Sequence, residues 1–232
     1  MIPGHRDPIP LPEPTPLSPP QDWAARLAAL GVSLDAAATA KLGDYLARLL
    51  AMNERMNLTA VTDPLEVWTR HGLDALSLVP LLAGLGPRAS LVDVGSGGGV
   101  PGIPLAVARP DLRVTLVEAT QKKAAFLAAV TEALGLANVS VRAERAEQLG
   151  RGPLREAFDV ATARAVGKIA QLAPLMVPFV KPGGRVLLIK GQRAGEELAE
   201  AAAVLGRLRC AAEQTVETPT GRIVVLRVGA RR

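Results

Sequence analysis

The stretch that decides the fold is LVDVGSGGGVPG, residues 91–102. An apolar run that ends in an acidic residue is typical of a buried strand, and a glycine-rich turn follows it. Glycines permit positive φ angles and let a ligand approach the backbone closely. The prolines at 101 and 104 suit the first turn of a helix, whose free N–H groups could face that ligand. The stretch therefore predicts a strand–turn–helix unit that binds a ligand at its turn.

The chain beyond this unit alternates between short apolar runs and helix-like segments. We expect strands at residues 90–94, 113–118, 139–142, 158–163, 185–190, 209–216 and 223–228, with helices between the first six. Such alternation is typical of βαβ units and of a parallel sheet covered on both faces. Residues 217–222 are too few for a helix, so the last two runs predict a hairpin. The fold class is α/β, with a seven-stranded, mostly parallel sheet and an antiparallel edge.

The N-terminal part of the chain is organised differently. Residues 1–21 hold eight prolines, which predicts a disordered tail. Residues 22–86 predict a helical extension: a helix over 22–30, a second from a Ser33 cap to about residue 52, and a third over 64–82. Asp63 would cap that third helix, with Pro64 in its first turn. Residues 87–232 would then form the main domain.

Composition limits the classes of site and partner. The chain has 232 residues, one cysteine and two histidines, so we expect no disulfide and no metal site. No apolar run is long enough for a membrane span, and no secretion signal opens the sequence, so we expect a soluble cytoplasmic protein. Residues 87–232 carry 21 basic and 13 acidic groups, while residues 1–86 carry six and nine. A polyanionic partner is one explanation, and a solubilising surface is the other.

Two cofactor classes and a plain structural turn compete for the glycine-rich loop. The spacing of Gly97, Gly99 and Gly102 matches the dinucleotide fingerprint. The wider pattern, with Asp93 and Gly95 before them, resembles the first motif of class I S-adenosylmethionine-dependent methyltransferases, which have a Rossmann-like fold. The acidic residue favours the second reading, because a carboxylate attracts a cationic methyl donor and repels a pyrophosphate.

Further candidate cofactor residues follow the next two strands. Glu118 ends the second strand, where its carboxylate could accept hydrogen bonds from both ribose hydroxyls of a cofactor. The alternative is a structural role, as a negative charge at the N-terminus of the next helix. Ala119 and Thr120 would continue along the same ligand edge. Ala146 and Glu147 follow the third strand. In a methyltransferase sheet this turn flanks the adenine of the cofactor; the alternative is an ion pair at the start of a helix.

Cations follow the fourth and fifth strands, where ligands of open α/β sheets bind. Arg164 ends one strand, Lys190 ends the other, and Arg193 lies nearby, so all three are candidates to position the substrate. An aromatic platform for a base would need Trp68 or Phe158, or an arginine plane in their place. Two familiar catalytic elements are missing. The fourth strand is not followed by the Asn/Asp-Pro-Pro-aromatic motif of amine methylases, and Cys210 falls in a predicted late strand rather than at the site.

Taken in order, these segments resemble the guanine-N7 methyltransferases of small-subunit ribosomal RNA, also called glucose-inhibited division protein B. The resemblance spans about residues 45–230. It is carried by NERMNLTAV at 53–61, HGLDAL at 71–76, residues 93–104, RAE at 145–147, ARA at 163–165 and LIKG at 188–191. Family members usually have an aromatic residue where this chain has Met52.

The resemblance implies methylation of one guanine in a 16S ribosomal RNA loop near the decoding centre. It implies that S-adenosylmethionine is the cofactor, with contacts at Gly95, Val100, Glu118 to Thr120, Ala146, Glu147 and Arg164. Guanine N7 carries a lone pair and no proton, so the reaction needs no general base. We expect 16S RNA, free or within the small subunit, as the partner of a monomer. His71 and Asp74, three apart on a predicted helix, would face the same way and either brace the helices or touch RNA.

Three other functions remain open on the sequence alone. The first is a methyltransferase for a small molecule or a protein. The second is an NAD(P)-dependent oxidoreductase, because the glycine spacing also fits a dinucleotide. The third is a non-catalytic RNA-binding module of ribosome assembly.

Overall fold

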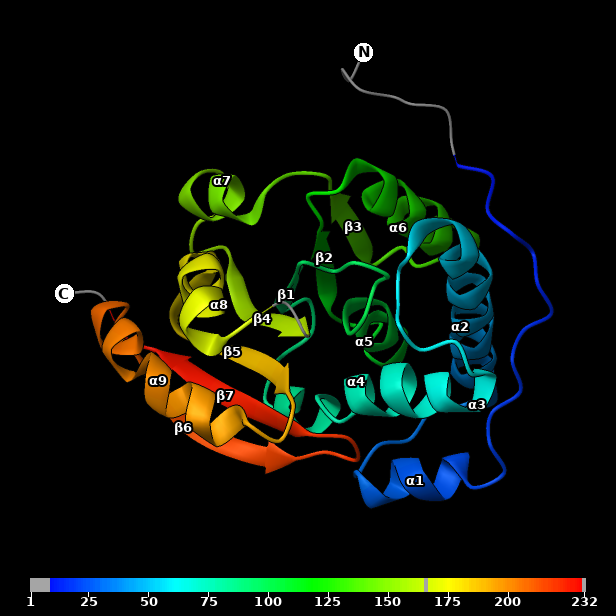
Figure 1. Ribbon diagram of the computed structural model, residues 1–232, viewed down its shortest axis with the longest axis horizontal. Helices are drawn as coiled ribbons and strands as arrows, with labels where there is room; N and C mark the ends of the chain where they lie inside the picture. The colour runs from blue at the N-terminus through cyan, green and yellow to red at the C-terminus, as the bar shows by residue number, and fades with distance from the viewer. Residues whose placement is uncertain (1–8, 165–166, 231–232) are drawn as a thin grey trace, which may run out of the picture.

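The computed structural model describes residues 9–164 and 167–230, and within them seven strands form one sheet in the order β3-β2-β1-β4-β5-β7-β6 (Figure 1). The strands are β1 (Ser90–Val94), β2 (Arg113–Val117), β3 (Val139–Arg142), β4 (Phe158–Arg164), β5 (Val180–Lys190), β6 (Cys210–Glu217) and β7 (Arg222–Val228). Strands β1 to β5 pair in parallel, and β7 runs antiparallel to both β5 and β6. The predicted α/β fold with an antiparallel edge is confirmed.

One strand is longer than its sequence pattern predicts. Strand β5 begins at Val180, because Phe158 pairs with Val180 while Val160 pairs with Arg185. The intervening residues bulge out of the pairing, and Gly183 takes a φ of 80° there. The run of lysine, proline and two glycines has no apolar alternation, so periodicity places the start of the strand too late.

Helices cover both faces of the sheet, and successive strand residues serve opposite faces (Figure 1). Leu187 packs in the core cluster that includes α5 (Gly102–Ala108) and α6 (Gln121–Ala133). Leu188 packs in the other cluster, together with the second-face helices. Those are α7 (Ala146–Arg151), α8 (Ile169–Met176), the short 3-10 turn η3 (Val177–Phe179) and α9 (Ala194–Arg207).

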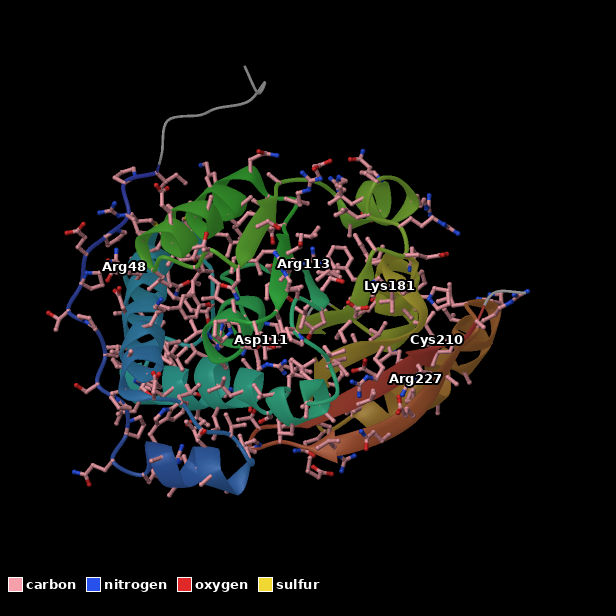
Figure 2. All side chains as sticks on the ribbon, turned by 180° about the vertical axis from the view of Figure 1, so that it is seen from behind. Arg48, Asp111, Arg113, Lys181, Cys210 and Arg227 are labelled. Atoms are coloured by element: carbon pink, nitrogen blue, oxygen red, sulfur yellow. The ribbon has the colours of Figure 1, made fainter. Side chains whose placement is uncertain are left out.

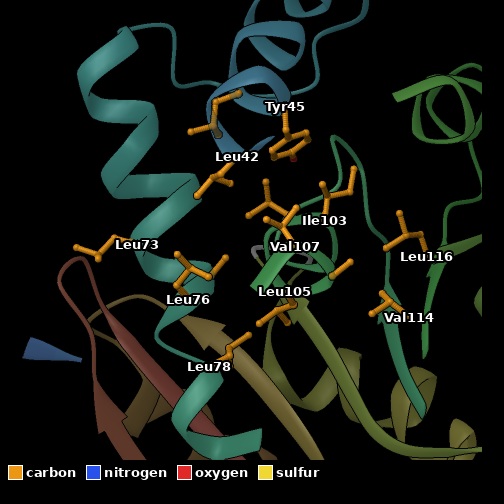
Figure 3. Close-up of a cluster of buried hydrophobic side chains, with 14 of the residues drawn as sticks. Leu42, Tyr45, Leu73, Leu76, Leu78, Ile103, Leu105, Val107, Val114 and Leu116 are labelled. Atoms are coloured by element: carbon orange, nitrogen blue, oxygen red, sulfur yellow. The ribbon is translucent and has the colours of Figure 1, made fainter. Parts of the chain in front are cut away.

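The N-terminal helices share the first of these cores, as Figure 3 shows for side chains of α2, α4 and α5. Asp35 caps the long helix, not Ser33, because its carboxylate accepts from the Ala38 N–H at 2.7 Å. The helix also runs past the expected end, and Asn57 closes it at a φ of 51°. The elements are α1 (Trp23–Ala29), α2 (Ala36–Met56), α3 (Pro64–Val67), the π-turn η1 (Trp68–Leu73), α4 (Asp74–Leu76) and the 3-10 turn η2 (Val79–Leu82).

The third helical segment is therefore not one regular helix. Asp63 caps α3 as predicted, since its carboxylate accepts from the N–H groups of Leu65 and Glu66. The chain then widens into η1, where the Asp74 N–H donates to the Thr69 carbonyl five residues back. Such π-turns insert one residue into a helix and are frequent at functional sites. No periodicity in the sequence marks this turn.

The described part of the proline-rich segment is not a free tail. It runs in an extended form along α2, where the Leu17 N–H donates to the Gly43 carbonyl at 3.2 Å. Arg48, which lies between α2 and this segment in Figure 2, donates to the Pro12 carbonyl at 3.0 Å. Ile9, Leu11 and Leu17 pack half-buried on the core. An extended proline-rich strand leaves its carbonyls unpaired, so it can bind a neighbour in this way. Residues 1–8 of the predicted tail lie outside the described residues.

Over the described residues, no helix is long and apolar enough to cross a membrane.

Candidate functional site

A cavity of about 500 Å³ lies at the carboxyl ends of the central strands, between the sheet and the N-terminal helices. One wall is the glycine-rich loop after β1, and the opposite wall includes the π-turn and the turn between β6 and β7. Arg164 and Lys190, at the ends of β4 and β5, complete it. The remaining lining comes from Leu49, Leu58, Thr59, Ala60, Val61, Arg70, His71, Asp74, Gly95, Ser96, Gly97, Gly98, Val100, Ile189, Gly191 and Thr220.

The glycines of the loop have two different purposes. Gly95 and Gly97 have φ angles of 72° and 54°, in the left-handed region that glycine adopts readily because it has no Cβ. A Cβ on Gly97 would meet nothing closer than 3.9 Å, so this part of the loop is open on the cavity side. A Cβ on Gly98 would lie 2.7 Å from Leu49, and one on Gly102 would lie 2.8 Å from the Asp93 carboxylate. Gly97 therefore leaves room for a ligand, whereas Gly98 and Gly102 pack the loop against the fold.

Two carboxylates hold the loop from behind. Oδ2 of Asp93 accepts from the Gly102 N–H at 3.1 Å, at the start of α5. Glu118 accepts from the N–H groups of Gly97, at 2.9 Å, and Thr120, at 2.7 Å. Each Glu118 oxygen keeps a second lone pair, so the side chain can still accept ribose hydroxyls while it fixes the loop.

Asp93 is fully buried, and its Oδ1 has no hydrogen-bond partner in the described part of the chain. Burial raises the pKa of Asp93 to about 7, against the lowering effect of the Gly102 N–H. A buried acceptor without a donor is costly unless something supplies one. Asp93 does not itself line the cavity, but its carboxylate lies directly behind the glycine loop, where negative charge favours a cationic cofactor such as S-adenosylmethionine. The same charge would repel a pyrophosphate.

Arg164 is held by the π-turn. Its Nη1 donates to the Arg70 carbonyl and, at 2.9 Å, to Nδ1 of His71. Since Nδ1 accepts, the ring proton lies on Nε2, which donates to the Thr59 hydroxyl at 2.6 Å. Burial and the nearby Arg164 charge lower the pKa of His71 to about 4. His71 is therefore a neutral bridge between β4 and the loop after α2, and both of its nitrogens are in use.

Tyr45 is a site residue that the sequence analysis missed. Its hydroxyl donates to the Gly98 carbonyl at 2.8 Å, which ties α2 to the glycine loop. The ring is fully buried beside Leu42 and Ile103, pointing from α2 toward α5 (Figure 3). Tyr45 is the single tyrosine of the chain and lies on an apolar helix face. A buried phenol needs a partner, and that requirement was the available signal.

The candidate cations differ in their surroundings. Lys190 lines the cavity, but its Nζ pairs with Glu197 at 2.8 Å and donates to the Gly167 carbonyl, and the side chain is only 7% exposed. Arg193 does not line the cavity; it pairs with Glu196 at the surface and its side chain is 74% exposed. Arg70, which sequence reasoning did not select, lines the cavity and remains exposed.

The aromatic residues cannot form the expected platform in this structure. Trp68 is fully buried and stacks edge-on against Trp23, with ring centroids 4.8 Å apart. Phe158 is buried against Phe179. Met52 is buried as well and does not line the cavity. Of the predicted stacking groups, the arginine plane remains.

Of the predicted cofactor residues, Gly95, Gly97, Val100 and Arg164 line the cavity. The others do not: Asp93, Glu118, Ala119, Thr120, Ala146 and Glu147. Ala119 and Thr120 are exposed after β2, next to the Glu118 carboxylate. Ala146 begins α7 and Glu147 follows it, exposed. Within the described residues, no group of three or more His, Cys, Asp and Glu side chains could hold a metal ion. Cys210 is buried in β6 (labelled in Figure 2), so it is not a nucleophile for this cavity.

Comparison with known proteins identifies the relatives of this chain. The family model described as "rRNA small subunit methyltransferase G" matches residues 38–222. A protein of that name from Sorangium cellulosum (strain So ce56) is 69% identical over 98% of this chain and 95% of its own length. Another, from Dehalococcoides mccartyi (strain CBDB1), is 42% identical over 78% of this chain and 77% of its own.

Solved structures support the fold independently. A SAM-dependent methyltransferase from Aquifex aeolicus matches with a TM-score of 0.58 and 16% identity, covering 74% of this chain and 97% of that one. A SAM-dependent O-methyltransferase from Thermotoga maritima matches with a TM-score of 0.53 and 16% identity, covering 79% of this chain and 72% of that one. At this identity the likeness concerns the fold alone.

Proposed function

Because the chain belongs to the rRNA small subunit methyltransferase G family, we propose that it transfers a methyl group from S-adenosylmethionine to N7 of a guanine in 16S ribosomal RNA. The guanine would lie in the loop near the decoding centre that the resemblance implies. Family membership supports the reaction class and the ribosomal RNA substrate. The choice of N7 follows the resemblance given by the sequence, and the groups of the cavity are compatible with it.

The observation that supports the choice of N7 is that the histidine and the lysine of the cavity are already engaged. Both His71 nitrogens are in hydrogen bonds, and its pKa of about 4 leaves it a poor base at neutral pH. Lys190 is paired with Glu197. Asp74 also lines the cavity, but guanine N7 has a lone pair and no proton to lose, so methylation there requires none of these groups to act as a base.

The cofactor, when bound, supplies an electrophilic methyl group on a sulfonium centre. The chain's residues bind and orient it: Gly97 leaves room beside the loop, Asp93 provides the negative charge, and Glu118 accepts from the ribose. Arg164 borders both the loop and the substrate space, so its guanidinium can orient the base from one side. The proposed binding set is Asp93, Gly95, Gly97, Val100, Glu118, Ala119, Thr120, Ala146, Glu147 and Arg164.

The proposed domain division gives residues 22–86 a direct part in the site. This helical extension supplies Arg70, His71 and Asp74 to a cavity whose floor belongs to the methyltransferase domain, residues 87–232. Residues 9–21 would then be a strap on that extension. One hydrophobic core spans both parts, so a single chain builds the whole cavity, in line with the proposal that the protein acts as a monomer.

The basic surface of residues 87–232 supports RNA as the partner, either free or within the small subunit. RNA binding that neutralises several phosphates weakens steeply as salt rises, whereas turnover of a small molecule does not. The protein would act in the cytoplasm, where its substrate is assembled.

The test is transfer of a labelled methyl group to small ribosomal subunits, to free 16S RNA and to 23S RNA, at several salt concentrations. We expect label on the 16S RNA, with a rate that falls as salt rises. Saturable binding of S-adenosylmethionine without transfer to any of these RNAs would favour another methyl acceptor or a non-catalytic role. Thermal stabilisation by NAD(P) and not by S-adenosylmethionine would favour an oxidoreductase.

A further inference from the structure

The proposed reaction gives no task to the carboxylate of Asp74. This side chain lines the cavity and is only 3% exposed. Its Oδ2 accepts from the hydroxyl of Thr220, in the turn between β6 and β7. Its Oδ1 is buried and has no hydrogen-bond partner among the described residues. A buried carboxylate oxygen without a donor is costly, and because Asp74 lines the cavity, a bound ligand can supply the missing donor.

The neighbours of Asp74 compensate its charge without donating to Oδ1. Arg164 and Arg70 are close enough to lower the pKa of Asp74, although burial raises it overall. Arg164 donates its hydrogen bonds to the Arg70 carbonyl and to His71. The cavity therefore offers a cation and, next to it, a carboxylate that accepts hydrogen bonds.

That pair matches one purine edge. Guanine presents O6 as an acceptor and, beside it, N1–H and the N2 amine as donors. Adenine presents an amine, then the N1 lone pair, and no N2 group. A carboxylate next to a guanidinium would therefore accept hydrogen bonds from guanine. On adenine it would face the N1 lone pair, which repels it. N7 lies on a different edge of the ring and stays free to face the glycine loop.

We propose that Asp74 is the residue that selects guanine, by accepting hydrogen bonds from N1–H and the N2 amine of the target base. Oδ1 accepts one of these hydrogens, and Oδ2 accepts the other with the lone pair that Thr220 leaves free. The role rests on the proposed function, since it assigns a specificity to the same cavity. It is a recognition role and not a proton transfer, because methylation at N7 releases no proton that a base must take.

The experiment compares wild type and Asp74→Asn on RNA that carries either guanine or inosine at the methylated position. Inosine keeps N7, O6 and N1–H and lacks only the N2 amine. We expect inosine to lower kcat/KM of the wild type about tenfold or more, the usual effect of removing a hydrogen bond to a charged group. In Asp74→Asn, kcat/KM on guanine should fall, and the guanine-to-inosine ratio should approach one.

Thr220→Val is the matched control. It removes the hydroxyl that supports Asp74 and keeps the carboxylate. It should therefore lower kcat/KM equally for the two RNAs and retain the wild-type guanine-to-inosine ratio. S-adenosylmethionine affinity should be the same in wild type and Asp74→Asn, which also verifies that the variant is folded.

Two results would overturn the assignment. One is a wild-type enzyme that methylates guanine and inosine equally, a result that needs no variant. The other is an Asp74→Asn enzyme that keeps the full wild-type ratio, which would leave Asp74 a purely structural role. If the wild type methylates neither RNA although it binds S-adenosylmethionine, the proposed function itself fails, and the specificity fails with it.

Discussion

Asp93 should make cofactor binding depend on pH. Its pKa of about 7 in the ligand-free protein means that the carboxyl is neutral below pH 7 and charged above it. A cationic cofactor binds the charged form better, so affinity for S-adenosylmethionine should rise as pH increases through 7 and level off above about 8. Isothermal titration from pH 6 to pH 8.5 measures this.

Asp93→Asn should weaken binding about tenfold or more at pH 8 and abolish the pH dependence. Asp111→Asn is the control. Asp111 precedes β2, so it lies at the amino ends of the parallel strands, away from the cavity, and it pairs with Arg109. An affinity that is flat with pH in wild type would mean that Asp93 stays charged without the cofactor.

His71 should make the fold sensitive to mild acid. Its pKa falls from 6.5 in the unfolded chain to about 4 in the folded one, so the unfolded state takes up the proton first. This contribution to stability is complete above pH 6.5 and is lost as pH falls from 6.5 toward 4. Between pH 7.5 and pH 5.5 the free energy of unfolding should drop by about 1 kcal/mol through this group alone.

Denaturant unfolding of His71→Asn checks the assignment. Asparagine can still accept from Arg164 but does not titrate, so the variant should lose about 1 kcal/mol less than wild type over the same pH interval. Equal losses in the two proteins would assign the acid sensitivity to other groups.

The glycine loop and α5 are locked together by Gly102. A Cβ there would meet Leu116 and come within 2.8 Å of the Asp93 carboxylate, both of which are buried and cannot move freely. Gly102→Ala should therefore lower the free energy of unfolding by about 1–3 kcal/mol and weaken cofactor binding as well.

Gly206→Ala provides the comparison. Gly206 lies in α9 with open space at its Cβ position, so alanine should leave stability unchanged or raise it by about 0.5–1 kcal/mol. If Gly102→Ala is as well tolerated as Gly206→Ala, the loop is looser than its contacts indicate.

Elements with a clear period or a terminal signal were predictable from the sequence. The sheet strands and the Asp63 cap follow from alternation and from capping chemistry, and both are confirmed. The π-turn η1 was not predictable, because no apolar period and no capping residue marks it in the sequence. The bulge in β5 was missed for a related reason, since its residues are neither apolar nor alternating.

The cavity shows the same division. The loop residues and Arg164 were found because they follow strands, and ligands bind at that edge of such a sheet. Tyr45, Arg70 and Thr220 were not selected, because they come from a helix, a helical turn and a distant hairpin that only the tertiary fold brings together. Arg193 was selected from its proximity in sequence, and its position on α9 keeps it out of the cavity.

The proline-rich segment should contribute to the stability of the whole molecule, contrary to the tail that the sequence predicts. Deleting residues 1–20 removes the Leu17 and Pro12 hydrogen bonds to α2 and exposes the core face under Ile9 and Leu11. We expect the free energy of unfolding to fall by about 1–3 kcal/mol. This is less than the free energy gained by burying three apolar side chains fully, because the conformational entropy lost on ordering the segment offsets part of that gain.

Point variants locate the effect. Leu17→Ala should reproduce part of the loss, while Ser18→Ala, an exposed neighbour, should be neutral. If the deletion changes neither the melting temperature nor methylation, the segment does not stabilise the protein and behaves as the free tail that the sequence predicts.

The central claim is methyl transfer to N7 of one guanine in 16S RNA, a reaction that needs no general base. The most direct measurement is to incubate the enzyme and S-adenosylmethionine with small subunits from cells that lack this activity, and then to map N7-methylguanine by backbone cleavage at the modified base. We predict a single cleavage position in 16S RNA, absent when the cofactor is omitted. Label on an exocyclic amine, on a ribose hydroxyl or scattered over many guanines would contradict the account.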